Sequence, residues 1–373
     1  MNILHLMKDY KPSPGGSVVR NSNMIEAYKR LYETDNIYIV NLEGGKYERH
    51  SWEKNILVYR TTTLWELVKT GVKLVNQKDI DVIQAHNFRF LFSAFLIHLL
   101  ARKKPEIFVE IHAIYHMSRL KEAVSFALLK RVRGITVLAQ CAKDYLVENH
   151  GIDPDIIHVI RNGAANLQPS LPVPVNCRIA DQLEAWKKRY RIAVYYGSFF
   201  EWQGVNFLGN HFDYLLDNEK DVFLLLLGDG PEYETIKRLS EKARFKDRIL
   251  VHCNIPKEEI LHVLEYADIV LIPRIKNIST DTAIPLKAIE AMEMGKCILA
   301  SNDNGLLEIL NQENAEIFDG GDIRSFLSHL QILVHDGEHR DKLGKRAKKD
   351  GEHLLLSWEE NSRRMHRLYE QKW

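Results

Sequence analysis

The 373-residue chain has only four cysteines, and none of them lies in a C-x-x-C or Cys/His pattern. This spacing gives no indication of a zinc site or a redox pair and is typical of thiols in a reducing compartment. The longest apolar run, residues 90–101, contains a histidine and is far shorter than the ~20 residues needed to cross a bilayer. The opening residues MNILHLMKDYKP lack the basic-then-apolar order of a secretory signal. We therefore expect a cytoplasmic protein.

The chain also has little net charge. Its 51 Lys and Arg against 50 Asp and Glu give a formal charge of +1, which provides no support for a nucleic-acid partner. The charge is unevenly divided, because residues 1–165 hold 23 basic and 17 acidic residues and residues 166–373 hold 28 and 33. An anionic surface or acceptor is therefore the more natural partner of the first half, although random scatter of surface charge explains the division equally well.

Short apolar runs alternate with amphipathic stretches through the first half. At roughly 100–200 residues per domain, the length allows about two domains. Runs that are apolar almost throughout, separated by helices, indicate a parallel sheet covered on both faces. The expected strands are 2–7, 36–42, 55–60, 81–86, 107–112, 135–139 and 157–162. The expected helices are about 17–33, 63–77, 89–102, 116–131 and 141–149.

A segment with three prolines within six residues, 169–174, interrupts this alternation and is our linker candidate, because proline breaks helices and central strands. Beyond it the expected strands are 192–198, 221–228, 248–253, 268–273 and 296–301, and the expected helices are about 204–217, 231–243, 256–265, 283–294 and 322–336. We predict two doubly wound α/β domains with a ligand cleft facing the carboxyl ends of their strands. The four predicted parts are a first domain 1–165, a linker 166–191, a second domain 192–355 and a C-terminal helix 356–373.

Two glycines and two histidines stand where ligand-binding loops are expected in the first half. Gly15 and Gly16 precede a helix that should begin near Ser17. Glycine leaves the backbone amides and the positive helix end open, so phosphate is the natural ligand, although a tight turn without a ligand explains the pair equally well. His86 and His112 end two expected strands. There an imidazole can donate to a sugar hydroxyl or move a proton, the alternative being a surface or capping role.

The segment 284–301, IPLKAIEAMEMGKCILAS, carries the sharpest pattern of the second half. Pro285 marks a helix start, and Lys287 lies in the first turn, where a cation is unfavourable against the helix dipole. This placement is explained if the lysine faces an anion that the helix N-terminal amides also hold. Glu290 could then accept hydrogen bonds from the vicinal hydroxyls of a ribose, and Arg274 follows a strand at the same edge. The alternative is an ordinary surface Lys/Glu pair.

Taken in order along the chain, these segments resemble a retaining glycosyltransferase of the GT-B fold, in the family 4 (glycosyl transferases group 1) type. The resemblance covers essentially the whole chain, and the order and spacing of the segments make it specific. The matching segments are GGSVVR (15–20), VIRNGAA (159–165), YYGSFFEWQGVNFL (195–208), LLLLGDGPEYETIKRL (224–239), LEYADIVLIP (264–273), PLKAIEAMEMGKCILAS (285–301) and SWEENSRRMHRLYE (357–370). The last one resembles a helix that crosses back to pack on the first domain.

The resemblance implies that a nucleotide-diphosphate sugar is held mainly by the second domain and an acceptor by the first. His112 matches a histidine that contacts the donor sugar near the anomeric carbon and is the candidate catalytic residue. Glu290 matches the residue that holds the ribose. The implied donor-side positions are Gly16, Ser198, Gln203, Arg274, Thr282, Ala283, Ile284, Pro285, Leu286, Lys287 and Glu290. The implied acceptor-side positions are Gly15, His86 and Asn162.

The sequence departs from the family pattern at three donor-side positions. The diphosphate-binding Arg and Lys of the family fall on Ser198 and Gln203, and the first Glu of its E-x7-E motif falls on Thr282. All three residues are uncharged, so the usual grip on the diphosphate and on the sugar is missing. Our hypothesis is that Arg274 and Lys287 supply the replacement charge.

The predicted function is metal-independent, retaining transfer of a sugar from a nucleotide-diphosphate sugar to an acceptor hydroxyl, without a cofactor, in the synthesis of bacterial cell-surface glycans or glycolipids. No D-x-D stands in a suitable loop, which agrees with metal independence. One alternative is a catalytically weakened homologue that acts as a binding or accessory subunit, as the three uncharged positions allow. The other is a nucleotide-sugar epimerase, which needs a more acidic cleft than these strand ends offer.

Residues 116–134, HMSRLKEAVSFALLKRVRG, combine apolar residues with basic ones in a helical pattern. Such a helix can rest on an anionic membrane surface, which would place the protein peripherally at the inner face of a membrane. The alternative is a helix that covers the domain and exposes a solvated basic end.

Overall fold

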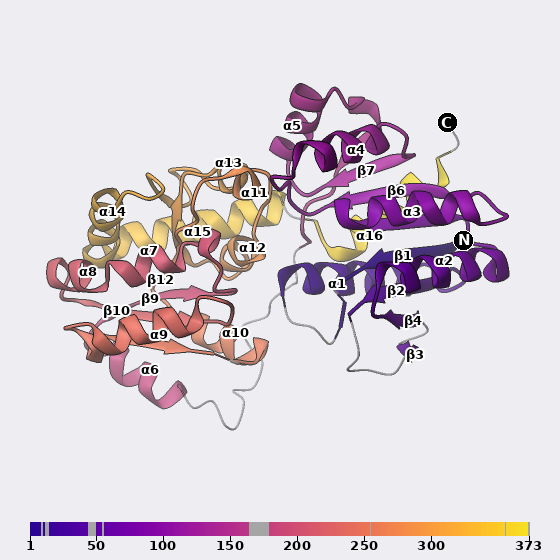
Figure 1. The fold of residues 1–373 in the computed structure, drawn as a ribbon. Coiled ribbons are helices and arrows are strands. Elements are labelled where there is room, and N and C mark those ends of the chain that lie inside the picture. Colours follow the sequence, from indigo (N-terminus) through magenta and orange to yellow (C-terminus); the bar gives the residue numbers. More distant parts are fainter. Residues whose placement is uncertain are drawn as a thin grey trace. The chain divides into compact units, whose positions relative to one another are not determined.

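The computed structural model describes residues 1–8, 10–11, 15–43, 50–53, 56–163, 179–253, 255–354 and 356–371. The chain divides into two compact units. Unit 1 comprises Met1–Gly163 and Leu356–Trp373, and unit 2 comprises Ala164–Leu355. Each unit contains one β-sheet with helices packed on it (Figure 1).

The strands of unit 1 are β1 (Asn2–Met7), β2 (Asn36–Leu42), β3 (His50–Glu53), β4 (Ile56–Thr61), β5 (Val82–His86), β6 (Glu106–Ile111), β7 (Gly134–Val137) and β8 (Ile157–Val159). They form one sheet in the order β3-β4-β2-β1-β5-β6-β7-β8. The neighbouring pairs are parallel except β3 and β4, which are antiparallel. The seven predicted strands are confirmed as the parallel ones. The pattern did not reveal β3, which is a short strand at the sheet edge.

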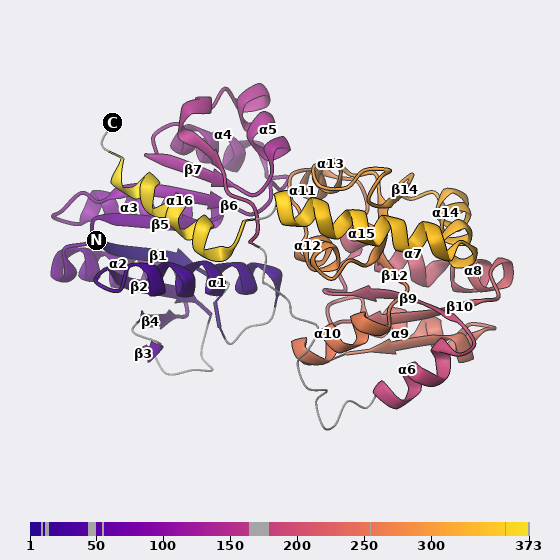
Figure 2. The ribbon, with the colours of Figure 1, turned by 180° about the vertical axis from the view of Figure 1, so that it is seen from behind.

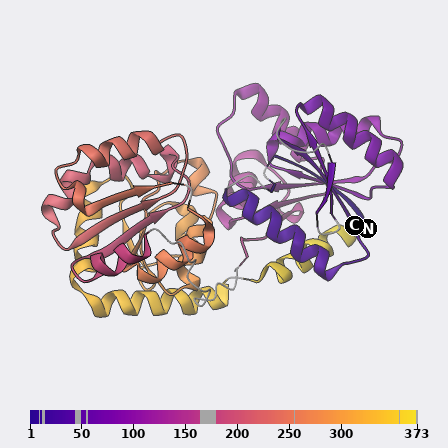
Figure 3. The ribbon, with the colours of Figure 1, turned by 90° about the horizontal axis from the view of Figure 1, so that it is seen from below.

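The helices of unit 1 are α1 (Gly16–Leu31), α2 (Leu64–Lys78), α3 (Phe88–Leu100), α4 (Arg119–Leu129), α5 (Gln140–His150), the short 3-10 helix η1 (Pro154–Ile156) and α16 (Trp358–Glu370). The C-terminal helix α16 lies beside α1 (Figure 2), and α2 and α3 lie together on the opposite face of the sheet (Figure 3). The Ser362 hydroxyl donates to the Met24 carbonyl over 3.0 Å, and 2.8 Å separates the Tyr28 hydroxyl from Nδ1 of His366. The predicted return of the C-terminal helix to the first domain is confirmed.

The strands of unit 2 are β9 (Arg191–Tyr196), β10 (Val222–Leu227), β11 (Ile249–His252), β12 (Ile269–Ile272), β13 (Cys297–Ser301) and β14 (Glu316–Phe318). Their order is β11-β10-β9-β12-β13-β14, and all pairs are parallel. The central strand β10, VFLLLL, is buried along its whole length, as expected for a sheet covered on both faces. The chain reverses the direction in which it adds strands between β9 and β12, which makes this the topological switch point of the unit.

The helices of unit 2 are α6 (Ala180–Lys187), η2 (Glu201–Gln203), α7 (Val205–Asn210), α8 (Phe212–Asn218), α9 (Tyr233–Lys242), η3 (Lys246–Arg248), α10 (Lys257–Tyr266), α11 (Ile278–Asp281), α12 (Leu286–Glu293), α13 (Asn304–Leu307), α14 (Ile323–His335) and α15 (Gly337–Leu354). The helix predicted over 204–217 is broken at His211 into α7 and α8. The long helix α15 was not predicted. Residues 180–187 of the expected linker are helical. Trp186 of this helix stacks on Phe223, with 4.1 Å between the ring centroids. The proline-bearing part of the linker lies outside the described residues.

Candidate functional site

The loops that follow β9 and β12 meet at the switch point of unit 2. The Ile275 amide donates to the Trp202 carbonyl over 3.1 Å. Gly204 has a φ of 77°, and a Cβ on this residue would lie 1.6 Å from the Pro273 carbonyl oxygen. Glycine is therefore required here by both conformation and space. This contact brings Ser198 and Gln203, which precede Gly204, to the same edge of the sheet as the loop after β12.

Arg274 holds the loop between β12 and α12. Its guanidinium donates to the carbonyls of Ala283 and Thr280 over 2.9 and 3.1 Å and pairs with Asp303 over 3.2 Å. Arg274 is 3% exposed and Asp303 is 0% exposed. The sequence predicts that Arg274 supplies charge to the diphosphate. These buried contacts instead assign its charge to Asp303 and to the loop itself, because a buried carboxylate requires a compensating cation.

Lys287 is buried, and its Nζ has no hydrogen-bond partner among the described residues. It lies in the first turn of α12 and is 7% exposed. Its Nζ lies 4.3 Å from the centroid of the Tyr195 ring and would be 3.6 Å from a Cβ on Gly197. Among the residues that the structure describes, none accepts a hydrogen bond from this Nζ. Buried polar groups are nearly always hydrogen-bonded, so this exception makes Lys287 a candidate ligand contact.

The remaining donor-side residues surround the same helix start. Thr282 is buried, and its hydroxyl donates to the Ile278 carbonyl over 2.6 Å, so it caps α11 locally. Pro285 is the N-cap of α12, and Leu286 is the first residue of the helix. Glu290 follows one turn later, near Tyr196, whose hydroxyl donates to the Lys287 carbonyl over 2.8 Å. The structure thus brings the predicted donor-side residues of unit 2 together at one edge of its sheet, with Ala283 and Ile284 between α11 and α12.

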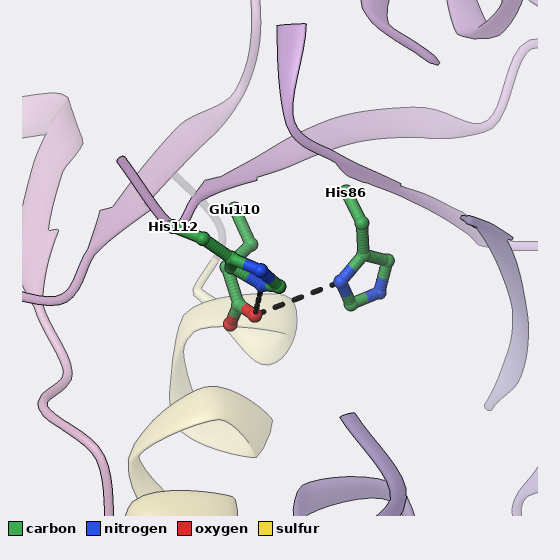
Figure 4. A group of neighbouring side chains, drawn as sticks. All are labelled: His86, Glu110 and His112. Atoms are coloured by element: carbon green, nitrogen blue, oxygen red, sulfur yellow. Dashed lines mark hydrogen bonds and ion pairs between the residues drawn. The ribbon is translucent and has the colours of Figure 1, made fainter. Parts of the chain in front are cut away.

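In unit 1, two predicted residues meet at a carboxylate that the sequence analysis missed. His112 Nε2 lies 2.6 Å from Oε1 of Glu110, and His86 Nδ1 lies 3.6 Å from the same oxygen (Figure 4). His86 is directly opposite Glu110 in the pairing of β5 with β6. All three side chains are buried. The signal in the sequence is a carboxylate inside an otherwise apolar strand, which predicts a buried partner.

That partner is Arg20 on α1. Its Nε and Nη2 donate to the two carboxylate oxygens of Glu110 over 3.1 and 3.0 Å, and its Nη1 donates to Oδ1 of Asn162 over 3.3 Å. Burial alone would raise the pKa of Glu110, but the charge of Arg20, the hydrogen bond from His112 and the nearby imidazole of His86 outweigh it and hold this pKa well below its usual range. Glu110 is therefore ionised at neutral pH. Asn162, predicted on the acceptor side, contributes to holding Arg20.

The carboxylate fixes the orientation and tautomer of His112. An ionised carboxylate can only accept, so Nε2 of His112 carries the proton in this hydrogen bond. The His112 amide donates to Oδ1 of Asn87 over 2.9 Å. Within the described ranges, Nδ1 of His112 has no hydrogen-bond partner, which leaves it available to a hydroxyl of a ligand. Gly15, with a φ of 131°, precedes α1, and Gly16 begins that helix.

His86 is linked to a further histidine, with 3.0 Å between its Nε2 and Nδ1 of His5. Burial lowers the pKa of both, so both are neutral at pH 7. The ligand atoms of His86, Glu110 and His112 lie within 4.8 Å of one another, as in a metal site. However, Arg20 donates to both oxygens of Glu110, and a divalent cation would have to compete with this guanidinium. We therefore interpret the cluster as a hydrogen-bonded network that orients His112.

The structure has the features of the GT-B class of glycosyltransferase. It has two doubly wound units and a C-terminal helix that returns to the first unit, and the candidate site of the second unit lies at a helix start beside its switch point. The family model described as Glycosyl transferases group 1 matches residues 179–350, and the model described as Glycosyltransferase Family 4 matches residues 32–165. The chain belongs to this glycosyltransferase family, as its motifs predict.

Named relatives and solved structures agree with this assignment. The phosphatidylinositol N-acetylglucosaminyltransferase GPI3 subunit of Saccharomyces cerevisiae is 23% identical over 269 residues, which are 69% of this chain and 56% of that protein. The D-inositol 3-phosphate glycosyltransferase of Corynebacterium jeikeium is 27% identical over 143 residues, 38% of this chain and 32% of that protein. The chain thus spans little more than half the length of the first relative. HepE of Anabaena in complex with UDP has a TM-score of 0.78 at 15% identity, covering 98% of this chain and 99% of that one; at this identity the likeness shows the fold.

Proposed function

We propose that the protein transfers a sugar from a nucleotide-diphosphate sugar to an acceptor hydroxyl with retention of anomeric configuration and without a metal ion. The observation that carries this proposal is the edge of unit 2, where a buried lysine stands at the start of α12 and Glu290 follows one turn later. In the described parts of the chain, no residue accepts a hydrogen bond from this lysine. An ammonium and a helix start suit a diphosphate, and a carboxylate suits the vicinal hydroxyls of a ribose. The neighbouring fold of HepE is described in complex with UDP-glucose, which supports a donor of this chemical class.

The proposed mechanism follows from the charges that develop as the bond between sugar and diphosphate breaks. As the bond from the anomeric carbon to the diphosphate oxygen breaks, negative charge grows on the diphosphate and positive charge grows on the sugar ring. Cations and helix amides that are fixed in place stabilise the leaving group without reorganising. The acceptor hydroxyl then attacks the anomeric carbon from the same face and gives its proton to the departing diphosphate oxygen, so no protein nucleophile is needed. His112, with Nδ1 available, is the proposed contact to the donor sugar.

The experiment is a donor panel followed by analysis of the product. UDP-glucose, UDP-N-acetylglucosamine, ADP-glucose and GDP-mannose are incubated with the protein, and donor hydrolysis and transfer to candidate acceptors are measured in the presence of EDTA. We expect turnover of at least one donor, an undiminished rate in EDTA, and a product with the donor's anomeric configuration by NMR. An inverted product would overturn the retaining mechanism, and loss of activity in EDTA would overturn metal independence.

A binding or accessory role is the second candidate function. The observation that favours it is the absence of charge at Ser198, Gln203 and Thr282, the last of which uses its hydroxyl inside the protein. The same panel separates the two functions, because an accessory subunit would bind a donor without turning it over. Turnover by the purified protein would rule this candidate out.

We place the acceptor among cell-surface glycans or glycolipids, and unit 1 offers a surface for contact with a membrane. On α4, Leu120 and Val124 are 77% and 44% exposed beside basic residues of the segment 116–134. Such a surface fits anionic lipid. The relative named for phosphatidylinositol is consistent with a lipid-linked acceptor. Among the described helices, none is both long and apolar enough to cross a membrane.

Vesicle flotation tests this surface. We expect binding to vesicles of phosphatidylcholine with phosphatidylglycerol at low salt, weakening at high salt, and a loss of about tenfold in affinity for Leu120→Ser because an apolar contact disappears. Ile332→Ser, at a residue of α14 that is 44% exposed, is the matched control and should bind as the natural protein does. Absence of binding at low salt, or equal binding by both variants, would contradict the membrane surface.

A further inference from the structure

The start of α12 has the features of an anion site, and among the described residues none caps it with a side chain or accepts a hydrogen bond from its lysine. This helix has eight residues, and in the described part of the chain no side chain caps its N-terminus. The Lys287 side chain leaves its first turn and ends against Gly197, where an added Cβ would be 3.6 Å from Nζ. The next residue, Ser198, stands where the family carries a diphosphate-binding arginine. The ammonium therefore lies beside the backbone position from which relatives extend that charge.

The charges around Lys287 come from each element packed against it. Arg274 follows β12 and is held by Asp303, which follows β13, and Glu290 lies one turn along α12 itself. On the β9 side the neighbour is the ring of Tyr195. Burial, followed by the charge of Arg274, lowers the pKa of Lys287 to about 7, against the opposing effects of Glu290 and Asp303. A lysine with this pKa is about half protonated in the free protein at pH 7.

We propose that Lys287 is the cation that binds the donor diphosphate in this protein and that it takes up a proton as the donor binds. This inference rests on the proposed function and adds to it the residue that bears the charge and the pH dependence of donor affinity. The ammonium form donates hydrogen bonds to the phosphate oxygens, whereas the neutral amine cannot offset their charge. The guanidinium of Arg274 stays with Asp303 throughout.

The direction of the pH effect follows from proton linkage. The diphosphate stabilises the ammonium form, so Lys287 has a higher pKa in the complex than in the free protein. Between these two pKa values, the complex holds a proton that the free protein lacks. Donor affinity is therefore highest below pH 7 and falls by about tenfold per pH unit above it, until the pKa of the complex is reached.

Titration calorimetry from pH 6 to 9 tests the inference with the nucleotide sugars of the donor panel, whose diphosphate does not titrate in this range. In buffers of different ionisation enthalpy, the natural protein should take up close to one proton at pH 8. Lys287→Met should bind about 10- to 150-fold more weakly at pH 6.5, as expected for a lost hydrogen bond from a charged group, with no proton uptake. Lys287→Arg, permanently charged, should restore affinity and show none of this pH dependence.

Two controls make the outcome decisive. Lys345→Met, at an exposed residue of α15, should bind and take up protons as the natural protein does. Thermal unfolding should show that Lys287→Met is at least as stable as the natural protein, because it removes a buried polar group without a hydrogen-bond partner. If the natural protein binds a donor and Lys287→Met binds it equally well at every pH, this inference is wrong while the proposed function stands. If the natural protein binds none of the donors, the proposed function itself falls, and this inference with it.

Discussion

Replacing Arg20 with methionine should destabilise unit 1 by about 3–5 kcal/mol, because it leaves the buried carboxylate of Glu110 without its compensating cation. Glu110 is 2% exposed, and both of its oxygens accept hydrogen bonds from Arg20. Urea denaturation measures the decrease in the free energy of unfolding. Hydrogen exchange of peptides from each unit shows which elements are destabilised. We expect exchange to rise in β6 and α1 and to stay unchanged in β9 to β13.

The double variant Arg20→Met/Glu110→Gln is the control for this prediction. It removes both charges, so it should recover most of the stability lost by the single variant. Because the double variant also loses the carboxylate that orients His112, it should stay poorly active despite its recovered stability. A double variant no more stable than Arg20→Met would show that the ion pair is not the cause.

Replacing Glu290 with alanine should lower kcat/KM for the donor by about 10- to 150-fold, the range expected for a lost hydrogen bond to a charged group. The reason is that vicinal ribose hydroxyls need an acceptor with two oxygens, and this carboxylate follows the diphosphate site by one turn of α12. Steady-state kinetics with the nucleotide sugar identified by the donor panel measure the effect. Glu290→Gln keeps one acceptor oxygen and should fall between the natural protein and the alanine variant.

Glu293→Gln is the matched control, since Glu293 is the last residue of the same helix and is also half-buried. It should keep its donor kinetics within about twofold, as expected of a side chain away from the site. Equal decreases in kcat/KM for the Glu290 and Glu293 variants would mean that the substitutions disturb the helix and that no specific ribose contact has been lost. An unchanged kcat/KM for Glu290→Ala would contradict the assignment of this edge to the nucleotide.

The parallel strands were predictable because both of their faces are buried, which requires runs that are apolar almost throughout. The elements that were missed lack this signal. Helix α15 buries mostly small residues, and Gly344 in it approaches the Gly295 carbonyl so closely that a Cβ would lie 2.3 Å from that oxygen. The short edge strands β3 and β14 are defined by the strand that each pairs with. Such contacts form only when the chain packs, so no periodic pattern in the sequence predicts them.

The positions of the candidate site residues in the fold were predictable where one rule of topology was enough. In parallel sheets the carboxyl ends of the strands share an edge, so His86, His112 and Glu290 could be assigned to ligand-binding edges from their positions after strands or in a helix start. The partners of these residues were not predictable. Arg20 and Glu110 are hydrogen-bonded although 90 positions separate them in the sequence. His5 and His86 are in contact although 81 positions separate them.

The sequence by itself determined the family and the two α/β units, because apolar runs, glycines and helix starts act over short distances along the chain. It also predicted the strand ends at which we propose that a sugar nucleotide binds. It also predicted that Arg274 and Lys287 both supply positive charge to the donor diphosphate. Only the tertiary structure distinguished them. Asp303, which follows β13, pairs with Arg274 in a buried contact, whereas Lys287 ends against a glycine and a tyrosine ring without a described acceptor. Which buried charge is compensated depends on distances in space between loops, and these are set only when the sheet has assembled.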